Sequence, residues 1–558
     1  MKVDQSLNKG RRDFLEGIGL STASALVLGV GTSLPGIANA AVANTSGDKH
    51  KATRTDRALA LRLESAKSSH RVPMAAAISN GDEARYLNGI ASFSKGMLHD
   101  ENGLVDPAAY QALLRAIKTG SPADFDAIPI GSTHMPLVNP QGGLCYGMAG
   151  LDSCQFEMKP APAFDSAERA GEHIECHWMA LLRDVPFTEY DSHPLVRAAC
   201  DELSGLSDFR GPKQHNRVTP QTVFRGITPG DLVGPYISQF LLQPIKLGAI
   251  PVNHKISTYL PIAKGGHDYL TGVEDWKNVQ NGEMPMDELR PDPVPRHLRS
   301  ARDLCAYAHT DYTYQAFFNA SVWLANHKAI VNPGSPYPNF HNQSGFATLG
   351  VPDAQGMLAS AHLAALRAVW YQKWIVHRTL RPEEFGGRVY FTMKGQADDP
   401  IHPELRHSVA LARDFERTGS YLLSQAYPEG CPQHPSYAQG HAAIAGACAT
   451  VLKAFYDGST RIMQIGDVVE STPDGRALVP YRNAQAGLLT VGGELDKLAG
   501  NIAAGRNFAG IHWRSDYLQG ILLGEEVAIN LMRECRMGYT ENIAALKLKK
   551  FDGSEIVI

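Results

Sequence analysis

Three short segments in the C-terminal half of the chain carry the residue types best suited to act together. The first holds Lys373 and Arg381, with seven residues between them. Helical periodicity over 353–380 places Lys373 among aromatic residues on a face expected to be buried. Pro382 disfavours helix at Arg381, which frees Arg381 to turn back. Taken alone, the segment is better explained by two cations whose stems cover apolar surface while their heads stay in water.

The second segment runs from His434 to His441 and leads into a run of small residues typical of a closely packed helix. Gly440 then lies at or near the helix N-terminus, where free N–H groups and the helix dipole favour an anion. His441 is positioned for acid–base chemistry beside that anion. The alternative is a helix start with a histidine satisfied inside the core.

The third segment has the pattern R-x3-G-x-H-x3-D, from Arg506 to Asp516. Arg506 and His512 would not share a face of one continuous helix. A break near Gly510, with a new helix beginning at about His512, would direct both side chains at one point. Asp516, one turn beyond His512, can hydrogen-bond the imidazole and fix its tautomer. The alternative is a surface cluster of ion pairs at a helix start.

Together the segments supply three cations, a helix-end amide, one histidine to bond a central atom and one histidine for acid–base work. This combination suits a tetrahedral oxyanion of phosphorus or of a phosphorus mimic.

The elements that position these residues are predicted to be helices. We expect an all-α fold of two helical bundles packed into one body, with few short hairpins. The best strand candidates are 389–393 and 462–480, and the proline-rich stretch 281–296 is predicted to be a long loop. The expected helices cover 107–117, 165–182, 228–242, 353–380, 404–426, 438–456, 491–504 and 511–533.

The composition sets outer limits on the protein class. Hydrophobic residues make up 44% of the 558 and charged residues 20%, enough for a sizeable core and too apolar for a disordered chain. A net charge of −4 argues against a dedicated nucleic-acid binder. No cysteine pair forms CxxC, so the eight cysteines fit buried hydrophobes better than a metal or disulfide framework, with one or two bridges left open for an exported protein.

The N-terminus is predicted to be a targeting segment. Arg11 and Arg12 form a twin-arginine pattern, 17–30 is a short apolar run, and Ala38-Asn39-Ala40 offers a cleavage site. We therefore predict a twin-arginine signal peptide over 1–40 and a periplasmic or extracellular mature protein without a membrane segment. The alternative is a disordered basic tail. The mature chain is divided into an N-terminal helical region, 41–290, and a C-terminal helical region with the anion site, 291–558.

The order of these motifs resembles the vanadium-dependent haloperoxidases and their relatives, the phosphatidic acid phosphatase type 2 acid phosphatases. Three earlier segments, 93–107, 167–175 and 226–235, resemble the bromoperoxidase-type members, so the likeness spans about residues 85–540. The gap of seven residues between Lys373 and Arg381 is also the bromoperoxidase spacing.

The resemblance implies a set of residues that hold vanadate. His512 would be the axial ligand to vanadium. Lys373, Arg381 and Arg506 would neutralise the equatorial oxygens, and the Gly440 amide would hydrogen-bond one of them.

The resemblance also implies catalytic roles and exposes two departures. His441 would be the acid–base group, with His434 close by, and Lys373 would hydrogen-bond the peroxide. Gln439 replaces the usual serine and removes a hydroxyl that would donate to vanadate; since a Gln amide is also able to donate, we expect a change in tuning and no loss of activity. Trp370, one turn before Lys373, is similar to the chloride-oxidising branch and leaves the halide preference open.

The implied activity is the oxidation of halide by hydrogen peroxide, with bromide favoured and chloride or iodide as alternatives. The product, hypohalous acid, would halogenate small organic substrates, and the enzyme would be a homo-oligomer. One competing hypothesis is an acid phosphatase of the same superfamily with His512 as nucleophile. The other is a non-catalytic helical protein with a degraded site, which rests on Gln439.

Overall fold

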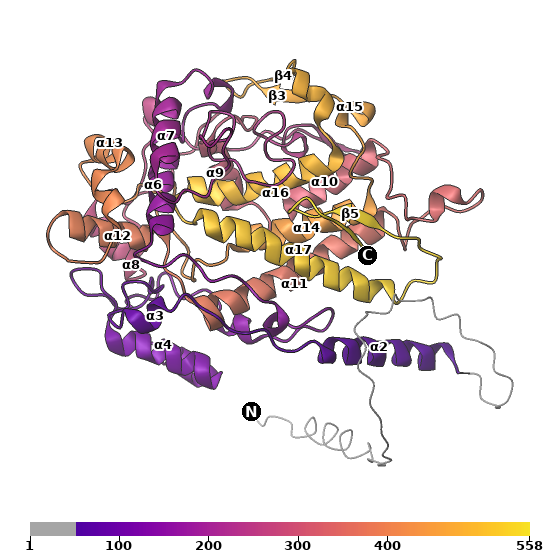
Figure 1. The fold of residues 1–558 in the computed structure, drawn as a ribbon, viewed down its shortest axis with the longest axis horizontal. Coiled ribbons are helices and arrows are strands. Elements are labelled where there is room, and N and C mark those ends of the chain that lie inside the picture. Colours follow the sequence, from indigo (N-terminus) through magenta and orange to yellow (C-terminus); the bar gives the residue numbers. More distant parts are fainter. Residues whose placement is uncertain (1–51) are drawn as a thin grey trace, which may run out of the picture. The chain divides into compact units, whose positions relative to one another are not determined.

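Helices dominate the computed structural model, which describes residues 52–558 (Figure 1). The prediction of an all-α fold with few short hairpins is confirmed. Among the described residues, the strands form three antiparallel two-stranded hairpins: β1 (Ile245–Leu247) with β2 (Ile250–Val252), β3 (Val469–Ser471) with β4 (Leu478–Pro480), and β5 (Lys547–Lys549) with β6 (Glu555–Val557).

Sixteen α-helices lie in the described range. The shorter ones are α3 (Asp82–Arg85), α5 (Pro122–Asp126), α8 (Val273–Gln280), α9 (Ala301–Thr310), α13 (Val409–Thr418) and α15 (Ile462–Ile465). The longer ones are α2 (Arg54–Arg71), α4 (Pro107–Thr119), α6 (Ala167–Leu181), α7 (Pro194–Gly205), α10 (Gln315–Asn326), α11 (Val351–Tyr371), α12 (Pro382–Met393), α14 (Gly440–Phe455), α16 (Val491–Phe508) and α17 (Arg514–Arg536).

Side-chain caps begin several of these helices. Asp106 accepts the N–H of Ala109 at the start of α4, and Ser166 accepts the N–H of Arg169 at the start of α6. Thr490 caps α16 in the same way. Each cap satisfies a backbone donor that has no partner inside its helix.

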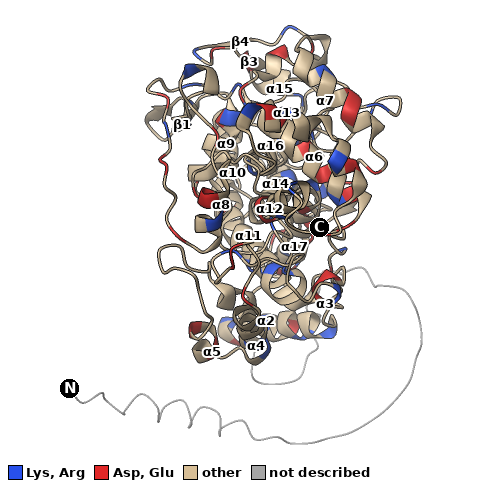
Figure 2. Ribbon diagram, turned by 90° about the vertical axis from the view of Figure 1, so that its left-hand side faces the viewer, with Lys and Arg blue, Asp and Glu red and all other residues tan. Residues whose placement is uncertain are grey.

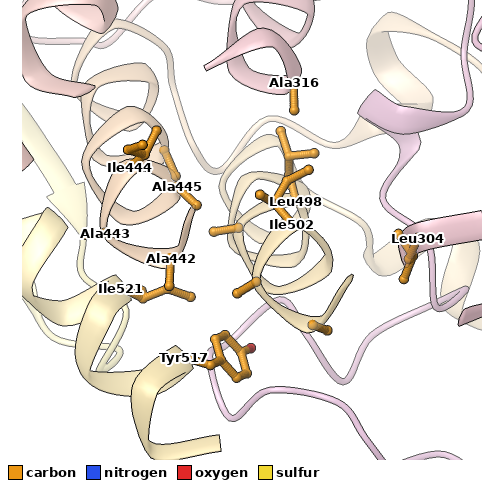
Figure 3. Close-up of a cluster of buried hydrophobic side chains, with 14 of the residues drawn as sticks. Leu304, Ala316, Ala442, Ala443, Ile444, Ala445, Leu498, Ile502, Tyr517 and Ile521 are labelled. Atoms are coloured by element: carbon orange, nitrogen blue, oxygen red, sulfur yellow. The ribbon is translucent and has the colours of Figure 1, made fainter. Parts of the chain in front are cut away.

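The core is centred on α14, which packs against α11, α16 and α17. Figure 3 shows Ala442 of α14 and Ile521 of α17 in this cluster, with Leu498 and Ile502 on α16. Glycines bring α14 and α17 together: a Cβ on Gly446 would lie 2.1 Å from the Ile521 carbonyl oxygen. The small residues after His441 therefore serve a close helix crossing.

Two expected elements are wrong. The predicted helix over 228–242 is a chain of turns ending in a short 3-10 turn, Gln239–Leu241. Gly234 has a φ of 74°, and Gly230 lies so close to Gly493 that a Cβ would meet its carbonyl oxygen at 1.8 Å. Tertiary packing of α16 therefore overrides the local helix signal.

The predicted strand over 389–393 is the last part of α12. A short apolar run does not distinguish a strand from a buried helix. Pro382 occupies the first helical position, and the Glu384 carboxylate accepts the N–H of Arg381 at 2.7 Å. These features start a helix that continues through 389–393, so this run is helical and not a strand. The predicted hairpin within 462–480 is confirmed as β3–β4, 281–296 holds no helix or strand, and the predicted helix over 404–426 shortens to α13.

The structure does not test the predicted signal peptide or the predicted domain boundary. The predicted signal peptide over 1–40 lies outside the described residues, and the boundary at 290/291 stays a prediction, since residues 58–558 form one compact unit.

All eight cysteines lie in the described range and are free thiols. No helix in this range is both long and apolar enough to cross a membrane. Positively and negatively charged residues are interspersed along the ribbon in Figure 2.

The glycine crossing predicts a stability difference between two Gly→Ala substitutions. In α17, a Cβ on Gly524 would lie 1.9 Å from the Ala443 carbonyl oxygen, whereas a Cβ on Gly356 in α11 meets nothing within 4 Å. G524A should lower the free energy of unfolding by about 1–3 kcal/mol. G356A should raise it by up to about 1 kcal/mol through helix propensity. Denaturant unfolding measures both, and equal effects would contradict the packing described.

Candidate active site

Lys373 and Arg381 flank the junction between α11 and α12. Beyond Tyr371 the helix continues as one π-helical turn, η8 (Gln372–His377), which carries Lys373. Arg378 then has a φ of 44°, and the extended Arg381 directly precedes α12. Both side chains are fully buried. A π turn of this kind re-aims a helix face and is frequent at functional sites.

Lys373 is held by backbone oxygens of the second sequence segment. Its Nζ donates to the carbonyl oxygens of Pro435 and Ser436, each at 2.6 Å. Burial, and after it the charge of Arg381, holds the pKa of Lys373 well below its usual value. The ammonium form therefore needs a nearby negative charge to be favourable.

The Arg381 guanidinium lies between two histidines. Its Nη1 is 2.7 Å from His512 Nε2, and its Nη2 is 3.0 Å from His434 Nδ1. Burial, followed by the charge of Arg381, holds the pKa of both histidines well below the usual range. Both imidazoles are thus neutral, which leaves a lone pair for an acceptor or ligand role.

Asp516 fixes the tautomer of His512. Its Oδ2 accepts from His512 Nδ1 at 2.7 Å and from the Trp513 N–H at 3.1 Å. The Ser436 hydroxyl also donates to it. With the proton on Nδ1, the lone pair of His512 is on Nε2, where it accepts from Arg381 Nη1 at 2.7 Å. The spacing of the third segment predicts this contact, whereas Ser436 was not singled out because its partner is 80 residues away.

The predicted helix break lies between Arg506 and His512. α16 ends at Phe508, Gly510 has a φ of +86°, and α17 begins at Arg514. Arg506 donates from Nη1 to the Ala308 carbonyl oxygen at 2.8 Å, while its buried Nε has no partner among the described residues. The break brings a guanidinium with a spare donor to the cluster.

The N-terminus of α14 borders the same cluster. Gly440 faces Trp370, to whose ring a Cβ would approach within 3.5 Å, and the Trp370 ring centroid is 4.7 Å from that of His434. The Gln439 Nε2 donates to the Ala503 carbonyl oxygen at 2.9 Å. An amide nitrogen carries two hydrogens, so the second can donate toward an anion, and the replacement of the serine hydroxyl by this amide stays a prediction.

His441 lies at the more accessible edge of the site. Its side chain is 26% exposed, and its Nε2 is 3.0 Å from Asp311 Oδ1. Asp311 follows α9, whose Ala308 carbonyl also accepts from Arg506. Sequence reasoning missed Asp311, which is 130 residues from its partner and carries no local motif.

The acidic face of α6 fixes the start of α17. Arg514 donates from Nε to Glu175 at 2.8 Å, and Glu172 accepts the N–H of Ser515 at 2.5 Å. These carboxylates at a helix N-terminus also complement its dipole. They hold the turn that presents His512.

An early segment fixes the start of α12 in the same manner. The N–H groups of Ser94 and Lys95 donate to Glu384 at 2.7 and 3.1 Å. The Lys95 ammonium pairs with Glu383 at 2.8 Å, both fully buried. Glu384 also accepts the backbone N–H of Arg381, so this network fixes the backbone position from which the Arg381 side chain extends.

The charges of the cluster point to an anion. Burial and the charges of Arg381 and Arg506 lower the pKa of Lys373, burial and Arg506 lower that of Arg381, and the carboxylate of Asp516 acts in the opposite direction on both. No group of three or more His, Cys, Asp or Glu able to hold a metal cation occurs in the described range. Buried cations beside a histidine nitrogen are a combination of groups that suits an oxyanion.

Known proteins share this architecture. The chain is 33% identical to the vanadium-dependent bromoperoxidase of Corallina officinalis, over 86% of this chain and 94% of that protein. It is 33% identical to the enzyme of that name from Ascophyllum nodosum, over 90% and 92%. The homohexameric structure of the second vanadate-dependent bromoperoxidase from Ascophyllum nodosum matches with a TM-score of 0.85 and 30% identity, over 98% and 95%. The family model of the VCPO second helical-bundle domain matches residues 355–539.

The role of Asp516 is testable by anion binding. D516A removes the acceptor that orients His512, so affinity for vanadate should fall about 10- to 100-fold. Quenching of tryptophan fluorescence on titration measures it, since Trp370 and Trp513 lie at the cluster. E64A, which alters an exposed ion pair, is the control. An affinity for D516A within twofold of the unaltered protein would show that Asp516 does not orient the ligand.

Proposed function

The chain belongs to the vanadium-dependent haloperoxidases of the bromoperoxidase type, and from this premise we propose that it oxidises halide ions with hydrogen peroxide at the cluster around His512. Membership makes it an enzyme with a vanadate cofactor. The finer proposal is that bromide is the favoured halide and that the hypohalous acid formed halogenates small organic substrates. The observation that carries the proposed halide oxidation is the lone pair of His512 Nε2, which lies beside buried cations.

The donor set fits a tetrahedral vanadate. His512 would hold vanadium through Nε2, while Lys373, Arg381, Arg506 and the Gly440 amide would hold its oxygens. The unpartnered Nε of Arg506 supports this, because a buried guanidinium donor without an acceptor costs free energy that an anion oxygen would recover. Vanadate, when bound, supplies a Lewis-acid centre that activates hydrogen peroxide toward halide.

The chain's own residues manage charge and protons around that centre. Two hydrogens of the Lys373 ammonium would stay on the Pro435 and Ser436 carbonyl oxygens, and the third would donate a charge-assisted hydrogen bond to an anion oxygen and draw electron density from it. Asp311 accepts from His441 Nε2, so Nδ1 is the nitrogen of His441 left to take and return a proton. His434, fixed between Arg381 and Trp370, lines the same space as a neutral acceptor.

A bromination assay tests the proposal. The purified protein with hydrogen peroxide and bromide should brominate a dimedone-type reporter only when orthovanadate is present, and phosphate should suppress the rate. H512A should lose vanadate-dependent turnover by at least about 100-fold, because no other group bonds the central atom. The exposed H341A is the matched control.

The opposite result has a definite meaning. Hydrolysis of a phosphate monoester without bromination would favour the acid phosphatase alternative with His512 as the nucleophile. Substituting chloride or iodide for bromide ranks the halides, and faster oxidation of chloride would overturn the bromide preference.

Export and self-association are proposed as well. The twin-arginine pattern over 1–40 supports export to the periplasm or beyond, and the homohexameric relative supports a homo-oligomer. Two measurements on protein recovered from outside the cytoplasm test signal cleavage and self-association. Mass spectrometry should find an N-terminus just after Ala40, and light scattering should give a multiple of the chain mass. An intact N-terminus or a monomer would contradict the respective proposal.

A further inference from the structure

Gln439 lies at the N-terminus of α14, next to Gly440 of the candidate site. It is fully buried and directly precedes Gly440, at the cap position of α14. Its backbone N–H donates to the Asp516 carbonyl oxygen at 3.2 Å, and its side chain reaches the Ala503 carbonyl oxygen at 2.9 Å. The residue thus connects α14 to both helices that carry the third sequence segment.

Chemistry fixes the direction of the Gln439 amide. A backbone carbonyl oxygen only accepts, so the amide atom facing Ala503 must be the nitrogen. The oxygen, Oε1, then points elsewhere. It is buried and finds no donor among residues 52–558. A buried acceptor left unpaired is costly, so its presence calls for a donor from outside the described chain.

The surroundings indicate where that donor comes from. Ala503 is one helical turn before Arg506 on α16, and Asp516 is the residue that orients His512. Gly440 follows Gln439 directly as the first residue of α14, where backbone N–H groups have no partner within the helix and favour an anion. The amide therefore lies among the groups that would surround a bound oxyanion.

We propose that Gln439 makes the site select an oxyanion that carries a hydroxyl group, whose proton is donated to Oε1. This inference rests on the proposed vanadate site and deepens it by naming the form of anion accepted. Vanadate and phosphate keep a hydroxyl at neutral pH, whereas sulfate presents lone pairs on all four oxygens. A fixed acceptor repels the anion that cannot donate to it, which is discrimination by an unfavourable contact.

A serine at this position would not discriminate in the same way. A hydroxyl rotates to donate or to accept, so it serves protonated and deprotonated oxygens alike. The Gln439 Oε1 lacks that freedom, because an amide oxygen only accepts and the hydrogen bond from Nε2 to Ala503 fixes the side on which the oxygen lies. The substitution therefore changes the selectivity of the site while its cations stay in place.

The test compares the affinities of vanadate, phosphate and sulfate in four proteins: the unaltered chain, Q439S, Q439A and Q243S. Gln243 is a buried glutamine that also donates to a backbone carbonyl, that of Asp467, outside the cation cluster. All titrations are run by calorimetry at one pH and ionic strength. The charge states of the surrounding groups are then common to the three anions: Lys373, Arg381, His434, His441, Arg506, His512 and Asp516.

The expected result is a change in the ratio of the vanadate affinity to the sulfate affinity, not an equal loss of affinity for all anions. Q439S should bind sulfate about tenfold or more tightly relative to vanadate than the unaltered chain does, because a donor replaces the fixed acceptor. Q439A, which removes Oε1 without adding a donor, should shift the ratio in the same direction by less. Q243S should keep the original ratio.

Two other results overturn the inference at different levels. A vanadate-to-sulfate ratio in Q439S and Q439A within twofold of the unaltered chain would mean that Gln439 only ties α14 to α16. Failure of the unaltered chain to bind vanadate or phosphate would remove the proposed site itself, and the inference with it. Circular dichroism confirms that each variant is folded, and Q439A stands in if Q439S is not.

Discussion

Mutual repulsion among Lys373, Arg381 and Arg506 is the constraint on which the rest of the structure depends. Their charged groups are buried together, where the interaction between like charges is poorly screened. Asp516 offsets part of the charge, and the carbonyl oxygens that accept from the cations offset more. A bound oxyanion completes the balance, because it brings negative charge to the point that all three cations share.

Holding such a cluster requires rigid supports, and these come from the N-terminal half of the chain. The carboxylates of α6 fix the start of α17, and the 93–95 segment fixes the start of α12 through Glu384. Gly230 packs against α16 at Gly493. The bromoperoxidase likeness therefore extends well beyond the anion motifs, since the segments that carry it hold the helix ends in place.

Local chemistry made part of the site predictable. Gly510 acts on the backbone beside it, so the sequence predicts the break between α16 and α17, and a spacing of four places Asp516 on His512. The helix expected to run to 380 instead ends in the π-helical turn at His377, before the left-handed Arg378. Asp311 and the orientation of the Gln439 amide depend on residues brought from distant helices, which no local pattern encodes. The same limit explains the wrong helix over 228–242. The helical fold was predictable, by contrast, because hydrophobic periodicity is summed over long segments.

The most direct test of the central claim is thermal unfolding with and without vanadate. If an oxyanion relieves the repulsion among the buried cations, vanadate at about 100 times its Kd should stabilise the fold by about 2.7 kcal/mol and raise Tm. Potassium chloride at matched ionic strength should not reproduce the shift, because the cluster is shielded from bulk ions by burial. An unchanged Tm with vanadate, or an equal shift with chloride, would contradict the account.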